Sequence, residues 1–281
     1  MKPRSAVGRR LINLAVSGLA AASALLGLLA LAWILSGVLT RGLGALNWSF
    51  FTQLPAPPGV PGGGLANALV GTLALTLLAT FLGVPVGLLA GVYLGEFGQQ
   101  SRLAHTTRFA VNVLMGVPSI IIGVFVYTLA VIPLGRFSGY AGALALDLIM
   151  LPIVARTTED MLRLVPDALR EAGLALGAPR WRITLAIVFR AARAGLITGV
   201  CLAVARVSGE TAPLLFTALN SPYFSHSLGE PTANLTVTIF NYAMSPYPDW
   251  QQMAWGASLL ITLGVLTLTL LARWSLRERP R

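Results

Sequence analysis

The chain has 281 residues, of which 56% are apolar and only 11% are charged, and its mean hydropathy is +0.76. A soluble domain carries about 25% charged residues, so this composition indicates that lipid rather than water solvates much of the chain. The single cysteine, Cys201, leaves no disulfide or zinc framework, and the single lysine, Lys2, leaves no Walker A phosphate loop, so energy from ATP must come through another subunit.

Apolar stretches of the sequence are long enough to cross a membrane. A bilayer core about 30 Å thick requires about 20 apolar helical residues. Six stretches meet or approach this length, namely 11–39, 65–94, 109–134, 140–154, 194–218 and 253–271. The first exceeds the apolar core of a signal peptide and is interpreted as an uncleaved anchor. The fourth is the shortest and contains Asp147, which we interpret as a residue near the membrane interface. The sequence therefore predicts an all-α integral membrane protein with six transmembrane helices.

The basic residues are sorted along the chain. With the N-terminus in the cytoplasm, 17 of the 20 basic residues fall on the cytoplasmic side, as the positive-inside rule requires. Arg41 and Arg136 fall outside, and Arg206 falls within the fifth span. This sorting predicts cytoplasmic N- and C-termini and excludes nucleic-acid binding as the explanation of the net charge of +10.

Three connections between the predicted spans are long. Residues 40–64 are rich in Pro and Gly and predict an extracytoplasmic loop. Residues 220–252 are also placed outside, and the amphipathic segment 235–242 is expected to lie at the interface or to fold back into the membrane. Residues 156–193 form a polar, helical loop in the cytoplasm. The predicted organisation is an N-terminal region of residues 1–64, a core of residues 65–273 containing the loop 156–193, and a cytoplasmic tail of residues 274–281.

The cytoplasmic loop carries a helix–turn–helix pattern. A helix-forming run from Arg170 is broken at Gly177, and Pro179 suits the first turn of a new helix. The residues alone also fit an amphipathic hairpin on the membrane surface. Glu171-Ala172, with Gly177 six residues after the glutamate, resembles the EAA loop of ABC importer permeases. In that family the loop forms a coupling helix that sits in a groove of the ATP-hydrolysing subunit. Gly173 in place of Ala departs from the pattern.

A wider resemblance covers residues 62–273. The segments that carry it are Gly116–Gly123, Arg156–Asp160, Gly209–Phe216 and Thr236–Tyr247. They resemble the permease subunits of phosphate-specific ABC importers. The resemblance implies a type I importer permease (MetI-like) fold in the cytoplasmic membrane of a bacterium, without a cofactor. It also implies that the protein transports inorganic phosphate by alternating access. The partners that it implies are a homologous permease subunit, two ATP-binding subunits and an extracytoplasmic phosphate-binding protein.

Two charged residues lie inside the fifth predicted span. Arg206 and Glu210 are four residues apart, so a continuous helix would present both on one face. An arginine at the bilayer centre costs about 2.5–3.5 kcal/mol on insertion scales, so such residues face protein or water. An ion pair that locks two helices together is one interpretation. With the resemblance, Arg206, Glu210 and Thr211 are expected to face the substrate pathway, where a guanidinium fork suits phosphate oxygens. Glu210 could accept the O–H of phosphate and repel sulfate.

The remaining patterns favour packing, with kinks expected at Pro85 and Pro118. Gly83, Gly87, Gly91 and Gly95 recur every four residues and predict a smooth ridge for a neighbouring helix. Other functions stay open: an ABC permease for another oxyanion or a phosphonate, and an intramembrane enzyme or proton-coupled carrier. An enzyme lacks support, because His105 and His226 fall on opposite sides and form no catalytic or metal cluster with the one cysteine.

Overall fold

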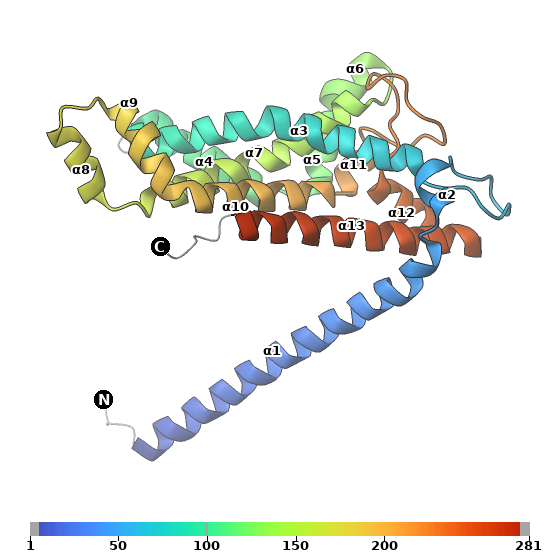
Figure 1. The fold of residues 1–281 in the computed structure, drawn as a ribbon, viewed down its shortest axis with the longest axis horizontal. Coiled ribbons are helices and arrows are strands. Elements are labelled where there is room, and N and C mark those ends of the chain that lie inside the picture. The colour runs from blue at the N-terminus through green and yellow to red at the C-terminus, as the bar shows by residue number, and fades with distance from the viewer. Residues whose placement is uncertain (1–5, 99–100, 276–281) are drawn as a thin grey trace.

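The computed structural model describes residues 6–98 and 101–275, and they form a bundle of long helices (Figure 1). Five helical segments are long and apolar enough to cross a membrane: Gly8–Ala45, Ala66–Phe97, Gly139–Arg163, Arg180–Ser208 and Pro248–Trp274. Within these described ranges, extended pairing is limited to one isolated bridge between Pro55 and Gly63. The predicted all-helical class is confirmed.

The elements follow one another in a simple order. They are α1 (Ala6–Gly42), η1 (Leu43–Ala45), α2 (Trp48–Thr52), α3 (Ala66–Val92), η2 (Tyr93–Phe97), α4 (Arg102–Gly116), α5 (Ser119–Val126), η3 (Tyr127–Val131), α6 (Ile132–Leu134), α7 (Gly139–Arg163), α8 (Asp167–Ala175), α9 (Arg180–Ile183), η4 (Thr184–Val188), α10 (Phe189–Ser208), α11 (Ala212–Leu215), α12 (Leu235–Ala243) and α13 (Pro248–Ser275). The segments η2, η3 and η4 are π-helical turns that extend longer helices.

The predicted span 109–134 is a bent pair of helices rather than one straight helix. The segments Arg102–Gly116 and Ser119–Leu134 meet at an angle of 105°. Pro118 lies at the corner, with φ −57° and ψ 136°, and immediately precedes α5. It has no N–H to continue a helix, and the residue before it is driven out of the helical region. The predicted span 109–134 is thus bent at Pro118, as expected, and the described residues contain five spans, or six if the bent pair is counted as one.

The fourth crossing is longer than its predicted stretch. Helix α7 has 25 residues and ends at Arg163, because the polar residues after Val154 continue the helix. The loop predicted over 156–193 is correspondingly shorter, since its first residues belong to α7 and its last residues to α10.

Helices α3 and α7 form the centre of the bundle, and glycines allow them to approach closely. A Cβ atom at Gly87 would lie 2.8 Å from the Cβ of Val154, and one at Gly91 would lie 2.5 Å from the carbonyl oxygen of Ala155. These distances are below ordinary van der Waals contact, so only glycine fits. The predicted packing ridge is confirmed.

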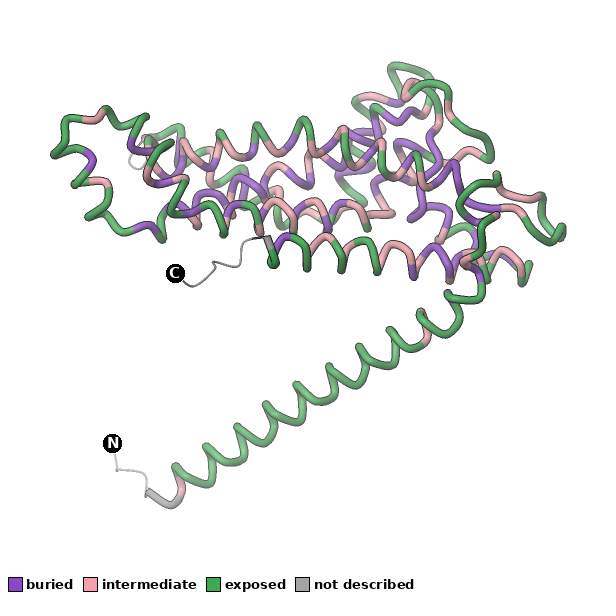
Figure 2. The backbone as a smooth tube through the Cα atoms, viewed as in Figure 1, coloured by how far each residue is buried: buried purple, intermediate pink, exposed green. Residues whose placement is uncertain are grey.

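Helix α1 diverges from the bundle and meets it only near its C-terminal end (Figure 1). Nearly its whole surface is exposed (Figure 2). At the junction, a Cβ on Gly42 would lie 2.8 Å from the carbonyl oxygen of Trp255 in α13. The first residues of α1 and the last of α13 lie toward the end of the molecule that carries α8 and α9, which we call the basic end.

The opposite end of the molecule contains short helices in segments that were predicted to be loops. Helix α12 packs inside the protein, with Leu235, Val237 and Tyr242 buried. The hydroxyl of Thr72 in α3 accepts a hydrogen bond from the N–H of Leu235 at 2.8 Å. Segment 235–242 thus forms part of the folded core, which favours the second of the two expectations, that it folds back, over a position at the interface.

Candidate functional site

At the basic end, α8 and α9 form an exposed helical hairpin closed by a glycine turn. Gly177 has a φ of +77°, a conformation that glycine adopts without steric cost. Its N–H donates to the carbonyl of Leu174 at 2.9 Å, and the N–H of Ala178 donates to that of Gly173 at 3.2 Å. This is a Schellman motif. Pro179 then leads into α9, so the predicted helix–turn–helix is present.

The predicted coupling residues lie on the outer surface of this hairpin. Glu171, Ala172 and Gly177 are exposed, while Gly173 is buried. A Cβ on Gly173 would lie 2.9 Å from the Cγ1 of Ile183. The substitution that departs from the EAA pattern therefore allows α8 to pack closely on α9, and it leaves the exposed face unchanged.

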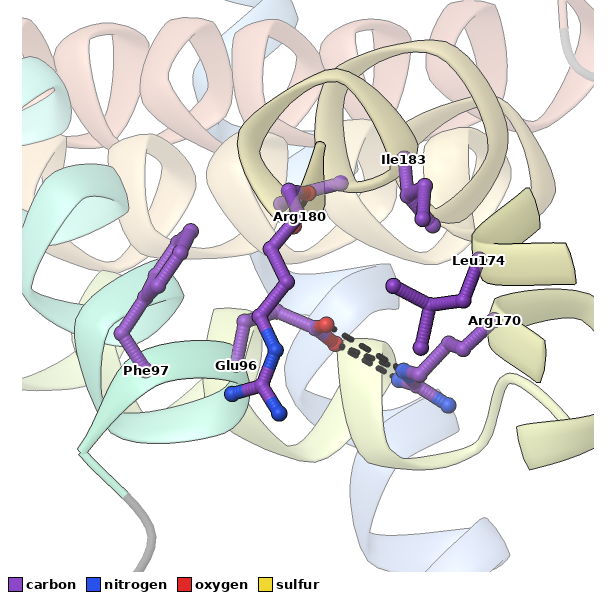
Figure 3. Close-up of a pocket in the computed structure, with 7 residues that line it drawn as sticks. Glu96, Phe97, Arg170, Leu174, Arg180 and Ile183 are labelled. Carbon is purple, nitrogen blue, oxygen red and sulfur yellow. Dashed lines mark hydrogen bonds and ion pairs between the residues drawn. The ribbon is translucent and has the colours of Figure 1, made fainter. Parts of the chain in front are cut away.

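Arg170 ties the hairpin to the end of the α3 segment. Its guanidinium donates to Glu96 Oε1 at 2.6 Å and also to the carbonyl oxygens of Leu162 and Val165 at 2.7 and 2.6 Å. Figure 3 shows Glu96 and Arg170 joined across a hollow of about 430 Å³. The hydrogen bonds to Glu96 raise the pKa of Arg170, and burial, which acts in the opposite direction, is the smaller effect.

A second charged cluster lies beside the first. Glu159 in α7 has only 1% of its side chain exposed, and its Oε1 lies 2.6 Å from both Arg108 Nε and Arg163 Nη2. Arg156 Nη1 is 3.7 Å from the other carboxylate oxygen. Arg108 also donates to the carbonyl of Leu94 at 2.7 Å. A buried carboxylate is stable only when it is paired in this way.

The two clusters were not predicted from the sequence. The spacing of Glu159 and Arg163, four residues apart, is a local signal that could have indicated a pair. Glu96 and Arg170 are 74 residues apart, and Arg108 and Glu159 are 51 apart. No periodicity within one helix connects residues on separate helices.

Arg206 opens onto a hollow of about 440 Å³ near the middle of α7. The lining is otherwise apolar apart from Ser119, and consists of Leu114, Met115, Val117, Ser119, Ile122, Ile149, Ile153, Leu202 and Arg206. The Arg206 side chain is 60% exposed. A charge exposed at this depth requires water or a second protein surface to solvate it.

Glu210 is close to Arg206, although not on the same helix. Arg206 Nη2 lies 3.5 Å from Glu210 Oε1, and the Glu210 side chain is 14% exposed. Helix α10 ends at Ser208, so the continuous fifth span predicted to Ala218 is wrong. The hydroxyl of Thr236 in α12 donates to the Glu210 carbonyl at 2.8 Å and holds the turn in place. The predicted pairing is present across a helix end.

Thr211 begins the short helix α11 beside the pair. Its carbonyl accepts from the N–H groups of Leu214 and Leu215 at 3.1 and 3.2 Å. Helix α11 lies against α5, where a Cβ on Gly123 would come within 2.6 Å of the Cα of Pro213. This close approach brings together the segments Gly116–Gly123 and Gly209–Phe216, two of the four that carry the sequence resemblance.

Asp147 lies inside α7, more than two helical turns from either end. Its Oδ1 faces Gly83 of α3, and a Cβ at that glycine would overlap the oxygen. Within residues 6–98 and 101–275, this buried Oδ1 has no hydrogen-bond partner. The helix-end position on which the interfacial interpretation of Asp147 rested is therefore wrong.

Two features are typical of a transport permease that works within a larger complex. One is a membrane-embedded arginine that needs a second surface, and the other is a hairpin exposed at the basic end. Residues 83–277 match the family described as binding-protein-dependent transport system inner membrane component. The chain belongs to this family.

Three curated relatives are phosphate transport system permeases. The chain is 51% identical to the phosphate transport system permease protein PstA of Yersinia pestis, over 94% of this chain and 90% of that protein. It is 50% identical to the PstA protein of Haemophilus influenzae, over 94% of each chain. PstA 1 of Mycobacterium tuberculosis is 39% identical over 94% of this chain and 87% of that protein.

Solved structures agree on the fold. A chain of the MetNI methionine ABC transporter in an inward-facing conformation matches with a TM-score of 0.63 at 23% identity, over 77% of this chain and 96% of that chain. A chain of a bacterial alginate ABC transporter matches with a TM-score of 0.68 at 12% identity, over 98% of both chains. The fold is that of a MetI-like importer permease, as predicted.

Proposed function

We propose that this chain is the permease subunit of an ATP-driven importer that moves inorganic phosphate across the cytoplasmic membrane. The observation that carries the proposal is the similarity, over 94% of the chain, to phosphate transport permeases at 51% and 50% identity. A cationic group within the membrane also favours the passage of an anion, and Arg206 supplies one in an otherwise largely apolar hollow.

Arg206, Glu210 and Thr211 are the residues we assign to the phosphate pathway. The planar guanidinium offers paired N–H donors that match two phosphate oxygens. Glu210 limits the net charge of the site and accepts the O–H that phosphate carries near neutral pH. The distance of 3.5 Å between Arg206 and Glu210 is longer than a tight ion pair, so the guanidinium retains donors for a ligand. A homologous permease subunit would close the exposed side of the hollow.

The exposed hairpin is the surface we assign to the ATPase subunits. Glu171, Ala172 and Gly177 present a face that no other described element covers. Basic residues of the sequence concentrate in and around this hairpin, and under the positive-inside rule this supports a cytoplasmic position for the hairpin and for both termini. The chain offers no phosphate loop of its own, because its single lysine is Lys2. Two ATP-binding subunits below and a phosphate-binding protein on the opposite side would complete the importer.

Alternating access follows from this arrangement. When ATP draws the two ATPase subunits together, each hairpin that is bound to an ATPase subunit moves with that subunit. The hairpin continues through α9 and η4 into α10 without a break from Arg180 to Ser208, so its displacement reaches Arg206 along one rigid helix. The hollow then opens outward to receive phosphate, and hydrolysis returns it to the inward state.

The test is uptake of radiolabelled phosphate by the complete importer reconstituted in liposomes. We expect uptake that requires ATP and the binding protein and is not inhibited by excess sulfate or methylphosphonate. Arg206→Gln should abolish uptake, whereas Arg190→Gln, an exposed arginine on the same helix, should leave it close to normal. If sulfate or methylphosphonate inhibits the uptake of labelled phosphate more strongly than unlabelled phosphate does, the substrate is another anion. Uptake driven by a proton gradient without ATP would contradict the proposal.

A further inference from the structure

We propose that Arg108 is a positioning residue that transmits movement of the coupling hairpin to α4, and so to the wall of the hollow that faces Arg206. The inference rests on the proposed function, which assigns coupling to the hairpin and the phosphate pathway to the hollow. It adds a second route of transmission, separate from the continuous helix that carries Arg206.

The first link joins the hairpin to η2. Arg170 of α8 holds Glu96 through its Nη2 at 2.6 Å and its Nε at 3.2 Å. Its remaining donors bind the carbonyl oxygens of Leu162 and Val165 on the α7 side. A forked, charge-assisted contact of this kind fixes both distance and orientation. A displacement of α8 therefore moves Glu96 with it.

The second link joins η2 to α4. Leu94 lies in the same π-helical turn as Glu96, and its carbonyl oxygen accepts a hydrogen bond from Arg108 Nη2 at 2.7 Å. Single π-helical turns occur frequently at functional sites in helices. Arg108 Nε is at the same time bound to Glu159 at 2.6 Å. One side chain of α4 thus contacts both η2, the turn that Arg170 ties to the hairpin, and the central helix α7.

Helix α4 depends strongly on this contact because it has little apolar packing. Among its residues only Ala104 and Val111 are buried. Leu103 and Phe109 are 64% and 70% exposed. The contrast with α3 is clear, because α3 interlocks with α7 along a row of glycines. An element with few buried apolar contacts moves easily, so we expect the charged link to contribute strongly to the position of α4.

The far end of α4 forms one wall of the hollow. Leu114 and Met115 line it, and the chain then turns through 105° into α5. Arg108 and Leu114 are six residues apart, about 9 Å along a helix. Leu202 and Arg206 of α10 form the opposite wall. The two walls are thus attached to the hairpin by different routes: α10 directly, and α4 through Glu96 and Arg108.

The experiment places reporters on the two walls of the reconstituted complete importer. Cysteine replaces Met115 or Leu202 in a Cys201→Ala background, and the rate of reaction with a small thiol reagent is measured with and without a non-hydrolysable ATP analogue. We expect ATP binding to change the rate at both positions. With Arg108→Met the change at Met115→Cys should shrink about 2- to 30-fold, the range of known coupling mutations, while the change at Leu202→Cys persists. Glu96→Gln should act in the same way.

The matched control is Arg102→Met, which removes an exposed arginine from the same helix. It should leave both rates as in the parent. Arg108→Lys keeps a charge beside Glu159 but cannot bind both acceptors, and should be intermediate. If Arg108→Met matches Arg102→Met at Met115→Cys, or if both reporters lose their response, the proposal is wrong. Failure of the parent importer to take up phosphate would instead contradict the proposed function.

Discussion

Arg206 and Glu210 form an ion pair across the end of a helix, with 3.5 Å between Nη2 and Oε1. Arg206 belongs to the last turn of α10, and Glu210 lies in the turn that follows. The backbone at Glu210 is fixed from outside by Thr236 of α12. The geometry of the pair thus depends on a residue 26 positions away, and a change there should alter the pair without touching its charges.

Thr236→Val tests that dependence. The substitution keeps the shape of a side chain that is 5% exposed and removes the donor to the Glu210 carbonyl. A hydrogen bond of this kind contributes about 0.5–1.5 kcal/mol, so we expect a modest loss of stability together with slower phosphate uptake. Initial uptake rates by the reconstituted importer measure the effect. Thr236→Ser retains the hydroxyl and should be close to wild type, and equal uptake by both variants would show that the turn does not need this contact.

Gly177→Val should uncouple the importer. Valine in the left-handed region costs about 1–2 kcal/mol, and open space around Gly177 excludes a clash as a further cause. The hairpin should change shape, so phosphate-stimulated ATP hydrolysis should fall while the subunit stays in the membrane. Gly135→Val is the control, because Gly135 has a φ of +65° with equally open surroundings at the other end of the bundle. Normal coupled turnover by Gly177→Val would count against the coupling role of the hairpin.

The number of crossings and the α3–α7 contact were predictable, because apolar length and a four-residue glycine repeat are properties of single segments. The break after Ser208 was harder to predict. The stretch 194–218 stays mostly apolar, and its one local marker is Pro213, which has no N–H to donate to Gly209. Pro118 predicted a kink, but the 105° angle follows from how α4 and α5 pack on different neighbours.

The residues of the candidate site also fall into two groups, those that the sequence indicated and those that it did not. Arg206 stood out in the sequence because a charge in an apolar span is costly, and the Gly177 turn stood out because glycine interrupts a helix-forming run. Glu96, Arg108 and Glu159 gave no comparable signal. They lie near the polar ends of separate helices, and their contacts arise only from the folding of α3, α4 and α7 against one another.

Gly91→Ala should destabilise the bundle. The added Cβ would lie 2.5 Å from the carbonyl oxygen of Ala155, so α3 and α7 must separate. Overpacking of this kind costs about 1–3 kcal/mol, which should appear as a lower unfolding midpoint in detergent. Gly264→Ala adds the same atom to α13, where nothing lies within 4 Å, and should be neutral or stabilising. Equal midpoints for the two variants would mean that α3 and α7 are not so closely packed.

Glu159→Leu should be more damaging than any neighbouring acidic substitution. It leaves Arg108 and Arg163 without their shared acceptor at a position that is 1% exposed, and removal of one partner from a buried ion pair costs about 3–5 kcal/mol. Thermal unfolding of the purified subunit measures the loss. Asp160→Leu is the control, because the Arg156–Asp160 pair is exposed and such pairs contribute about 0–1 kcal/mol. Comparable losses from both variants would contradict the central role of Glu159.

Glu210→Gln should weaken phosphate uptake and admit sulfate. Phosphate near neutral pH carries an O–H donor, whereas sulfate carries none, so a carboxylate tolerates the first anion and repels the second. The amide of glutamine has N–H donors and no charge, and this repulsion disappears. Loss of a hydrogen bond to a charged group is worth about 1.5–3 kcal/mol, so phosphate uptake should fall about 10-fold or more, and sulfate should become an inhibitor. Glu230→Gln, in the loop before α12, should change neither property. Normal phosphate uptake by Glu210→Gln at normal expression, still insensitive to sulfate, would remove the Arg206–Glu210 pair from the pathway.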